Sequence, residues 1–526
     1  MKIVLLPVLL LASSAAIAAP PAGFDARVEA LRQQAGVPGM AVAIVEDGQT
    51  VLAKGYGVRR LGAPEKVDAD TIFMTGSTGK AFTTAALATL VDAGKIDWDD
   101  KVVDRLPGFQ MYDPWVTREM TIRDLLVHRS GLGLGEGDLL FVPRSSLSRA
   151  EAVRRLRYLK PVTSFRSGFA YDNVLYMVAG QLIEAVTGQR WEDYVREHIL
   201  LPVGMTDSTT ENVKRFAIAD RAYPHARTSE AVRGLGPQAM LDERDALGDD
   251  AAPAGGLAIS ANDMAKWLAV QLGRGKLPGG GRLFSEAAHD EMWKPEIPQP
   301  ISPMPDSLKA TEPTFDNYAF GWEVRDYHGA KLVWHSGAVL GFKSIVVLIP
   351  DKRVGFAFEI NSEDGELITG LMYELIDHYL GRPFTDWPAR FSAYKKQRLA
   401  DALKIVQTKA AAPAKIGPSL SLDRYAGTYQ DPWYGQIVVS KGPTGLSVDF
   451  RSTPRMSGPL VHWQYDSFLL RFTDPTIEPA YLTFGLDADG HVSQITMKPV
   501  SPLADFSYDY QDLLFSPVGK PDQLAN

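Results

Sequence analysis

The residues whose types and spacing are best suited to chemistry lie in the segment Ser77-Thr78-Gly79-Lys80. Residues three positions apart on a helix share a face, so the amine of Lys80 can lie beside the hydroxyl of Ser77. A serine hydroxyl is a poor nucleophile until a neighbour takes its proton. A lysine close to a helix N-terminus and to other cations can have its pKa lowered enough to help. The spacing therefore predicts covalent chemistry at Ser77, assisted by Lys80.

The spacing alone is not specific, because Ser392-Ala393-Tyr394-Lys395 has it as well. That second copy lies in a charged segment that continues to Arg398, with no catalytic neighbourhood around it. The first copy is accompanied elsewhere in the chain by Tyr171-Asp172-Asn173, the only Tyr-x-Asn in the sequence, and by His335-Ser336-Gly337, which follows a predicted strand. These companions favour Ser77 as the nucleophile.

On these elements the sequence resembles the serine β-lactamase and penicillin-binding-protein superfamily. The most similar members are the class C-like serine hydrolases, which include DD-peptidases, D-aminopeptidases and esterases and carry S-x-x-K, Y-x-N and either K-T-G or H-x-G. The resemblance extends over about residues 25–380 through further matching phrases, which are Leu125–Leu132, Gly255-Gly256-Leu257 with Asn262-Asp263, and Phe320-Gly321-Trp322. The chain departs from the family at Arg166-Ser167-Gly168, where a Pro-Gly pair is usual, and at Gly133, where a proline is common, and both departures concern loop shape.

The resemblance implies roles for individual residues. Ser77 would be the nucleophile, Lys80 would help remove its proton, and Tyr171 would pass a proton to the leaving group and later help activate water. Asn173 would orient the substrate amide and Lys80. His335 stands where many members have a lysine, so its charge is expected to change with pH, and the rate with it, between about pH 5.5 and 8.

The same resemblance assigns the substrate-binding positions that follow His335, namely Ser336, Gly337 and Ala338. An acyl intermediate needs two preorganised donors for its oxyanion, and the backbone N–H groups of Ser77 and Ala338 are the matching candidates. Gly337 leaves room for the substrate to approach.

Structural explanations remain open for each residue taken singly. Ser77 also fits a helix N-cap, Lys80 a surface lysine, Tyr171 a core tyrosine and His335 a histidine at a strand end. Only their joint occurrence in the order of the family favours chemistry. For His128, which belongs to a family phrase but has no obvious proton to move, we expect a structural role.

Composition excludes several other classes of function. The formal net charge is −8 and the basic residues are scattered, so nucleic acid is not an expected partner. The absence of cysteine excludes disulfides, thiolate metal sites and a cysteine nucleophile. Neither the histidine spacings nor the glycine-rich segments match a metal or phosphate site, so we expect no metal and no cofactor.

The N-terminus has the pattern of an export signal. An apolar run from Ile3 to about Ala12 follows Lys2, and small residues follow at Ala16-Ile17-Ala18, which predicts a signal peptide over residues 1–18. A retained membrane anchor is the alternative. No later stretch approaches the roughly 18 apolar residues of a spanning helix. We therefore expect a periplasmic or secreted protein without stable membrane insertion.

The pattern of elements predicts an α+β fold over residues 19–385, with an antiparallel sheet flanked by helices and a mainly helical lobe. A hairpin around Asp47-Gly48 opens the fold with β structure. Helices are predicted at 80–91, near 122–127, 174–186, 191–199 and 262–272, and from about 366 to 380, and strands at 331–334, 342–348 and 354–360.

A separate all-β domain is predicted for the C-terminal part, residues 418–526. The connecting segment 386–417 contains the Ala- and Pro-rich stretch Lys409–Pro418, which is typical of a linker. Beyond it, short aromatic and β-branched runs separated by Gly, Pro and Asp predict a barrel or sandwich. Tyr425–Tyr429 is similar to the start of the lipocalin-like domain found on some of these hydrolases, where it can cover the active site or mediate assembly.

The resemblance implies an acyl-enzyme serine hydrolase. The expected substrates are small: D-amino-acid-containing or peptidoglycan-derived peptides or amides, with an ester as the next alternative and a β-lactam as the third. An alternative from another class is a non-catalytic protein that binds penicillin or cell-wall peptides, or senses them. The sequence does not indicate the stereochemical preference or the oligomeric state.

Overall fold

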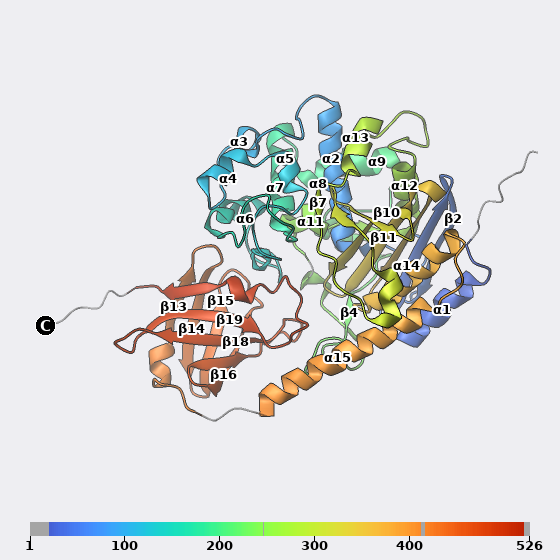
Figure 1. Cartoon of the computed structure of the whole chain (residues 1–526). Helices are drawn as coiled ribbons and strands as arrows, with labels where there is room; N and C mark the ends of the chain where they lie inside the picture. The colour runs from blue at the N-terminus through green and yellow to red at the C-terminus, as the bar shows by residue number, and fades with distance from the viewer. Residues whose placement is uncertain (1–19, 246, 412–415, 520–526) are drawn as a thin grey trace, which may run out of the picture.

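The computed structural model describes residues 20–245, 247–411 and 416–519 (Figure 1). The predicted signal peptide, residues 1–18, lies outside the described residues. Within the described part of the chain, no helix has both the length and the apolar character needed to cross a bilayer.

An antiparallel eight-stranded sheet forms the framework of the first part of the chain, in the order β2-β1-β12-β11-β10-β9-β8-β7. The predicted hairpin is confirmed, and so are the three later strands β10, β11 and β12, but three further strands, β7, β8 and β9, extend the sheet and were not predicted. The strands are β1 (Gly39–Glu46), β2 (Gln49–Gly57), β7 (Ile297–Pro298), β8 (Asp316–Tyr318), β9 (Glu323–Tyr327), β10 (Ala330–Val339), β11 (Phe342–Ile349) and β12 (Val354–Ile360).

Helices cover both faces of this sheet (Figure 1). Side chains alternate along a strand, so Val42 and Ile44 of β1 pack with α1 (Phe24–Ala35) and α14 (Gly365–Tyr379) on one face. Ala41 and Ala43 face the opposite core, which contains α2 (Lys80–Asp92) and α12 (Ala261–Leu272).

The fold begins with helix α1, so the expectation that it opens with β structure is wrong. Only Phe24 and Val28 of this helix are fully buried. Two buried residues give the sequence little of the repeating apolar pattern that identifies an amphipathic helix.

A mainly helical lobe connects β2 to the later strands, as predicted. Short pairs β3–β6 and β4–β5 accompany it, formed by Phe73–Met74 with Ala258–Ile259 and by His225–Ala226 with Ala239–Met240. Its helices are α3 (Val102–Arg105), α4 (Pro114–Glu119), α5 (Ile122–Leu125), α6 (Arg149–Arg155), α7 (Val174–Thr187), α8 (Trp191–Val195), a π-helical turn (Arg196–Leu200), α9 (Leu201–Val203), α10 (Asn212–Ala217), α11 (Ala252–Gly255) and α13 (Glu286–Met292).

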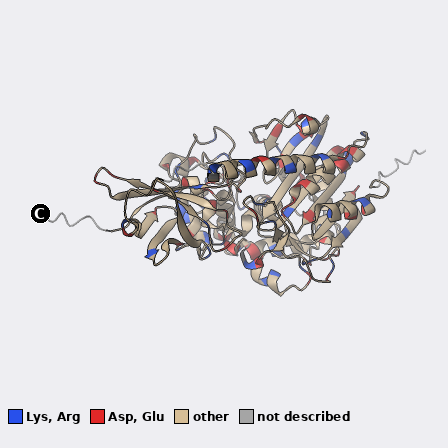
Figure 2. Cartoon of the chain, turned by 90° about the horizontal axis from the view of Figure 1, so that it is seen from below, with Lys and Arg blue, Asp and Glu red and all other residues tan. Residues whose placement is uncertain are grey.

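A long helix, α15 (Trp387–Ala411), occupies most of the connecting segment and runs along the outside of the first part of the chain. It carries six basic residues and one acidic residue, Asp401 (Figure 2). Helix α15 ends at Ala411, so the stretch predicted as a linker, Lys409–Pro418, begins inside its last turn. Residues 412–415 lie outside the described residues.

The C-terminal part is a closed eight-stranded antiparallel barrel. Closure leaves no unpaired sheet edge, and the interior is filled by aromatic side chains such as Tyr434, Phe450 and Phe484. Sequence reasoning missed two strands: one contains Pro459, which disguises a strand, and the other has four residues. The strands are β13 (Gly427–Asp431), β14 (Gly435–Gly442), β15 (Gly445–Phe450), β16 (Ser457–Gln464), β17 (Ser467–Leu470), β18 (Ala480–Leu486), β19 (Val492–Pro499) and β20 (Leu514–Pro517).

The barrel packs against the helical lobe at several places. The guanidinium of Arg155 in α6 donates to the backbone oxygens of Trp433 and Tyr434, at 3.2 and 2.5 Å. The segment between β19 and β20 extends from the barrel to the cleft beside Ser77. The barrel therefore supplies part of the cleft wall.

Candidate active site

Ser77 lies in a single 3-10 turn, Gly76–Gly79, that leads directly into helix α2. Gly76 has a φ of 58°, and a Cβ at this position would lie 2.5 Å from the backbone nitrogen of Ala338. A glycine is therefore required for the turn to lie against strand β10. This packing brings the nucleophile candidate beside the strand that carries the third motif.

Lys80 is the first residue of α2 and its side chain is fully buried. Its Nζ lies 3.0 Å from Ser77 Oγ, 2.6 Å from Asn173 Oδ1 and 2.9 Å from the backbone oxygen of Ala254. A neutral amine donates two hydrogen bonds and accepts one. The two carbonyl oxygens can only accept, so a neutral Lys80 can donate to both and accept the proton of Ser77.

The environment of Lys80 favours this neutral form. Burial lowers the pKa of Lys80 to about 7, and the negative charges of Asp138 and Asp172 oppose that shift only in part. An amine that is half deprotonated near neutral pH is a suitable proton acceptor for a serine hydroxyl.

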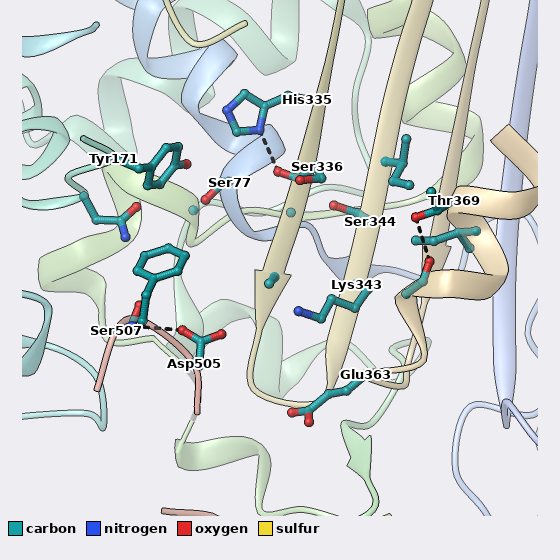
Figure 3. Close-up of a pocket in the computed structure, with 18 of the residues that line it drawn as sticks. Ser77, Tyr171, His335, Ser336, Lys343, Ser344, Glu363, Thr369, Asp505 and Ser507 are labelled. Carbon is teal, nitrogen blue, oxygen red and sulfur yellow. Dashed lines mark hydrogen bonds between the residues drawn. The ribbon is translucent and has the colours of Figure 1, made fainter. Parts of the chain in front are cut away.

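Tyr171 lies across the cleft from strand β10, and its hydroxyl is turned toward Ser77 (Figure 3). The hydroxyl oxygen is buried and has no hydrogen-bond partner among the described residues. Burial raises the pKa of Tyr171 well above its ordinary value. The phenol is therefore a neutral group with a proton free to donate.

Asn173 contacts Lys80 from the start of helix α7. Its Oδ1 accepts from Lys80, while its Nδ2 donates to Asp138 Oδ2 at 2.8 Å. Asp138 is fully buried in a 3-10 turn, Asp138–Leu140, and sequence reasoning missed it. The amide cannot reverse without placing its oxygen against a carboxylate, so Asp138 fixes the orientation of Asn173.

His335 is buried in β10 and both of its ring nitrogens have partners. Nδ1 lies 2.6 Å from the backbone oxygen of Ser336, and Nε2 lies 2.8 Å from the hydroxyl of Tyr318. The pKa of Tyr318 is raised well above its ordinary value, so this hydroxyl donates to Nε2 and the imidazole carries its single proton on Nδ1.

The expected change in the charge of His335 near neutral pH is therefore wrong. Burial, and secondarily the nearby Lys80 charge, lowers the pKa of His335 to about 3. Sequence reasoning assumed a solvated imidazole, whereas the ring is enclosed by Tyr318 and by its own strand. His335 is a neutral residue of the cleft wall at any pH near 7.

Gly337 is required for the close contact between β10 and the segment that precedes Ser77. A Cβ on Gly337 would lie 1.9 Å from the backbone oxygen of Thr75. Ser344 of β11 donates to the same oxygen at 2.5 Å, which fixes the segment against the sheet. The backbone of Ala338 is thereby held against Gly76, the residue before Ser77.

His128 lies behind Tyr171. The two ring centres are 4.1 Å apart, and Nδ1 of His128 accepts the backbone N–H of Asp172 at 3.1 Å. Burial lowers the pKa of this imidazole. These contacts agree with the structural role expected for His128.

The cleft beside Ser77 has a volume of about 610 Å³. It has an apolar part around Phe141, Val142, Phe169 and Leu247, and it is closed on one side by barrel residues that sequence reasoning did not identify, namely Asp505, Phe506 and Ser507 (Figure 3). The ring centre of Phe506 lies 5.9 Å from that of Tyr171.

The second copy of the Ser-x-x-Lys spacing has a different environment. Ser392 is exposed on α15, and Lys395 Nζ lies 2.5 Å from Asp364 and 3.2 Å from Glu366. These two carboxylates raise the pKa of Lys395 despite its burial. The residue is a permanently charged partner in an ion pair.

Relatives of known type match most of the chain. The Unguisins hydrolase ungD' of Aspergillus campestris is 30% identical over 427 residues, which are 77% of this chain and 74% of that protein. Penicillin-binding protein 4 of Amycolatopsis lactamdurans is 30% identical over 363 residues, 68% of this chain and 89% of that protein.

Solved structures share the fold. The octameric penicillin-binding protein homologue from Pyrococcus abyssi superposes with a TM-score of 0.58 at 21% identity, over 90% of this chain and 97% of that one. The D-amino acid amidase from Ochrobactrum anthropi SV3 gives a TM-score of 0.53 at 22% identity, over 68% of this chain and 97% of that one.

Two protein families match the two parts of the molecule. The barrel region, residues 411–517, matches a domain of unknown function, DUF3471. Residues 24–378, which include the sheet, the helical lobe and all of the residues around Lys80 except those from the barrel, match the family described as Beta-lactamase. The chain therefore belongs to the β-lactamase family and has its hydrolase fold.

Proposed function

We propose that the protein is a serine hydrolase that forms an acyl-enzyme on Ser77 and cleaves amide bonds in peptides that contain D-amino acids or derive from peptidoglycan. The observation that carries the proposal is the buried amine of Lys80, which lies 3.0 Å from Ser77 Oγ with a pKa lowered to about 7. Few structural roles require a fully buried lysine without an adjacent carboxylate.

In the proposed acylation step, Ser77 Oγ attacks the substrate carbonyl carbon while its proton moves to the neutral amine of Lys80. The backbone N–H groups of Ser77 and Ala338 hold the oxyanion of the tetrahedral intermediate. The carbon–nitrogen bond then breaks. The neutral phenol of Tyr171 gives its proton to the departing nitrogen and takes one from the Lys80 ammonium. The amine product therefore leaves as a neutral molecule, and the enzyme supplies the proton that this requires.

In the proposed deacylation step, a water molecule attacks the ester carbon of the acyl-enzyme. Its proton passes by the same groups to Ser77 Oγ as the carbon–oxygen bond to the enzyme breaks. The sum of both steps is hydrolysis of one amide to an acid and an amine, with Ser77, Lys80 and Tyr171 returned to their starting states.

The substrate class is supported by the chemistry of the cleft and by two of the similar proteins. A neutral His335 leaves the third-motif position without a fixed positive charge, which favours a neutral amide or ester over a substrate with a carboxylate at that point. Among the similar proteins, one is described as an unguisins hydrolase and another as a D-amino acid amidase. Esterase or β-lactamase activity would use the same groups, so a substrate panel must distinguish them.

The test is covalent labelling followed by a substrate panel. A fluorophosphonate probe should modify the peptide that contains Ser77, and Ser77→Ala should abolish the modification. Labelling that persists in Ser77→Ala would overturn the assignment. D- and L-amino-acid amides, esters and nitrocefin then rank the substrates, and stable labelling of the native protein with no turnover of any of them would instead indicate a binding or sensing protein.

A further inference from the structure

The barrel holds the turn that carries Asp138. Both oxygens of the Asp509 carboxylate, which belongs to the segment between β19 and β20, accept backbone N–H groups of the helical lobe. These bonds are 2.6 Å from Gly137 and 3.1 Å from Leu139. They flank Asp138 on either side, so the position of its turn depends on a residue of the other domain.

Asp138 itself receives a hydrogen bond from the same barrel segment. Ser507 Oγ donates to Asp138 Oδ2 at 2.7 Å, and Asn173 Nδ2 donates to the same oxygen at 2.8 Å. The other oxygen, Oδ1, is buried without a partner among the described residues. A fully buried carboxylate that has only two donors is costly, so each donor matters.

These contacts form one continuous path from the barrel to the nucleophile. Ser507 donates to Asp138, Asp138 accepts from Asn173, Asn173 accepts from Lys80, and Lys80 lies against Ser77. Each link is 3.0 Å or shorter. The path crosses from one domain to the other at the Ser507–Asp138 bond.

We propose that Ser507 of the C-terminal barrel is a positioning residue of the hydrolase site, acting through Asp138 and Asn173 to hold the amine of Lys80 in its reactive place beside Ser77. This inference rests on the proposed function of Ser77 and Lys80. The barrel is then a part of the active site of its own chain, in addition to forming one of its walls.

Electrostatics gives the physical reason. Burial raises the pKa of Asp138 to about 7, and the bonds from Ser507 and Asn173 oppose that shift. Without the Ser507 donor, Asp138 is protonated over a wider pH range. A protonated Asp138 no longer stabilises the charge on Lys80, whose pKa then falls further. The other charged groups around Asp138 are the barrel carboxylates of Asp505 and Asp509, which disfavour its ionised form.

The loss of the donor also affects geometry. Asn173 is held with its oxygen toward Lys80 because its NH₂ faces an ionised carboxylate. A protonated carboxyl can donate as well as accept, so the amide is no longer forced into one orientation. The amine then loses one of the acceptors that fix it beside Ser77.

The experiment measures the second-order rate of fluorophosphonate labelling of Ser77 between pH 5 and 9 for the full-length protein and three variants. Ser507→Ala removes the donor and Ser507→Thr retains it. Ser516→Ala is the matched control, because this serine lies on the exposed side of strand β20. The thermal unfolding midpoint of each variant is measured in parallel.

We expect Ser507→Ala to label about tenfold more slowly near pH 8, which is the effect of losing a hydrogen bond to a charged group. The acid limb of its profile, the low-pH range in which the labelling rate falls, should move to lower pH. Ser507→Thr should retain most of the rate, and Ser516→Ala should match the native protein. Equal rates and pH profiles for Ser507→Ala and Ser516→Ala would overturn the inference. The inference would also be overturned if Ser507→Ala labelled more slowly without any movement of its acid limb and Ser507→Thr did not retain the native labelling rate. Absence of labelling in the native protein would instead contradict the proposed function.

Discussion

Ser77–Lys80 and Ser392–Lys395 have the same spacing on a helix and opposite surroundings. The amine of Lys80 is fully buried among a hydroxyl and two carbonyl oxygens, and its pKa is lowered to about 7. The amine of Lys395 lies between two carboxylates, and its pKa is raised. The spacing brings an amine near a hydroxyl, but the charges around the amine decide whether it can accept a proton.

The largest effect on the labelling rate is expected from the loss of the Lys80 amine. Lys80→Ala should slow fluorophosphonate labelling of Ser77 by about 10³-fold, because among the described residues no other group near Ser77 is both neutral and basic at pH 7 to 8. The labelling rate of purified protein checks this, with the near-UV circular dichroism spectrum as the control for folding. A decrease of less than tenfold in a folded variant would mean that another group takes the proton.

The next effect comes from giving Lys80 the surroundings of Lys395. Asn173→Asp places a carboxylate against the Lys80 amine, which should raise its pKa by one or more units. Because the neutral amine is the active form, the labelling rate rises with pH through the pKa of Lys80. The acid limb, expected near pH 7 in the native protein, should therefore move to higher pH, and the rate at pH 7 should fall by about tenfold or more.

Asp364→Asn is the matched substitution at the second copy, because it removes a carboxylate from Lys395 instead of adding one to Lys80. This variant should keep the native labelling rate and the native limb. An unmoved limb in Asn173→Asp would show that Lys80 does not set the pH dependence. Movement of the limb in Asp364→Asn would show that the effect is not local to the cleft.

The sequence was sufficient to predict the parts of the site that depend on local spacing and on single motifs. Ser77 and Lys80 are three residues apart, so the 3-10 turn that leads into α2 brings them together. Five of the eight sheet strands were predicted because apolar, β-branched runs identify buried strands, whereas the short strands β7, β8 and β9 were not predicted. Tyr171 and Asn173 were assigned from the motif they share, and the structure brings both to the same lysine.

The parts that were missed depend on contacts between distant segments of the chain. Ser507 and Asp138 are 369 positions apart, and neither lies in a recognisable motif. The neutrality of His335 arises from its enclosure with Tyr318, which the residue type does not reveal. Local patterns thus predicted the motif residues of the site, whereas their more distant partners and their charge states depend on packing that only the folded chain shows.

The smallest expected effect concerns Lys395. Lys395→Ala should leave the labelling rate unchanged and lower the free energy of unfolding by about 1–2 kcal/mol, since its ion pairs with Asp364 and Glu366 are largely shielded from water. The raised pKa of Lys395 keeps it protonated in the folded and unfolded chains alike below about pH 10, and the pKa of Asp364 is lowered. The stability difference between the variant and the native protein should therefore stay constant from pH 6 to 9 in denaturant titrations. A difference that changes within this range would mean that Lys395 titrates near neutral pH, and the contrast between the two lysines would then be wrong.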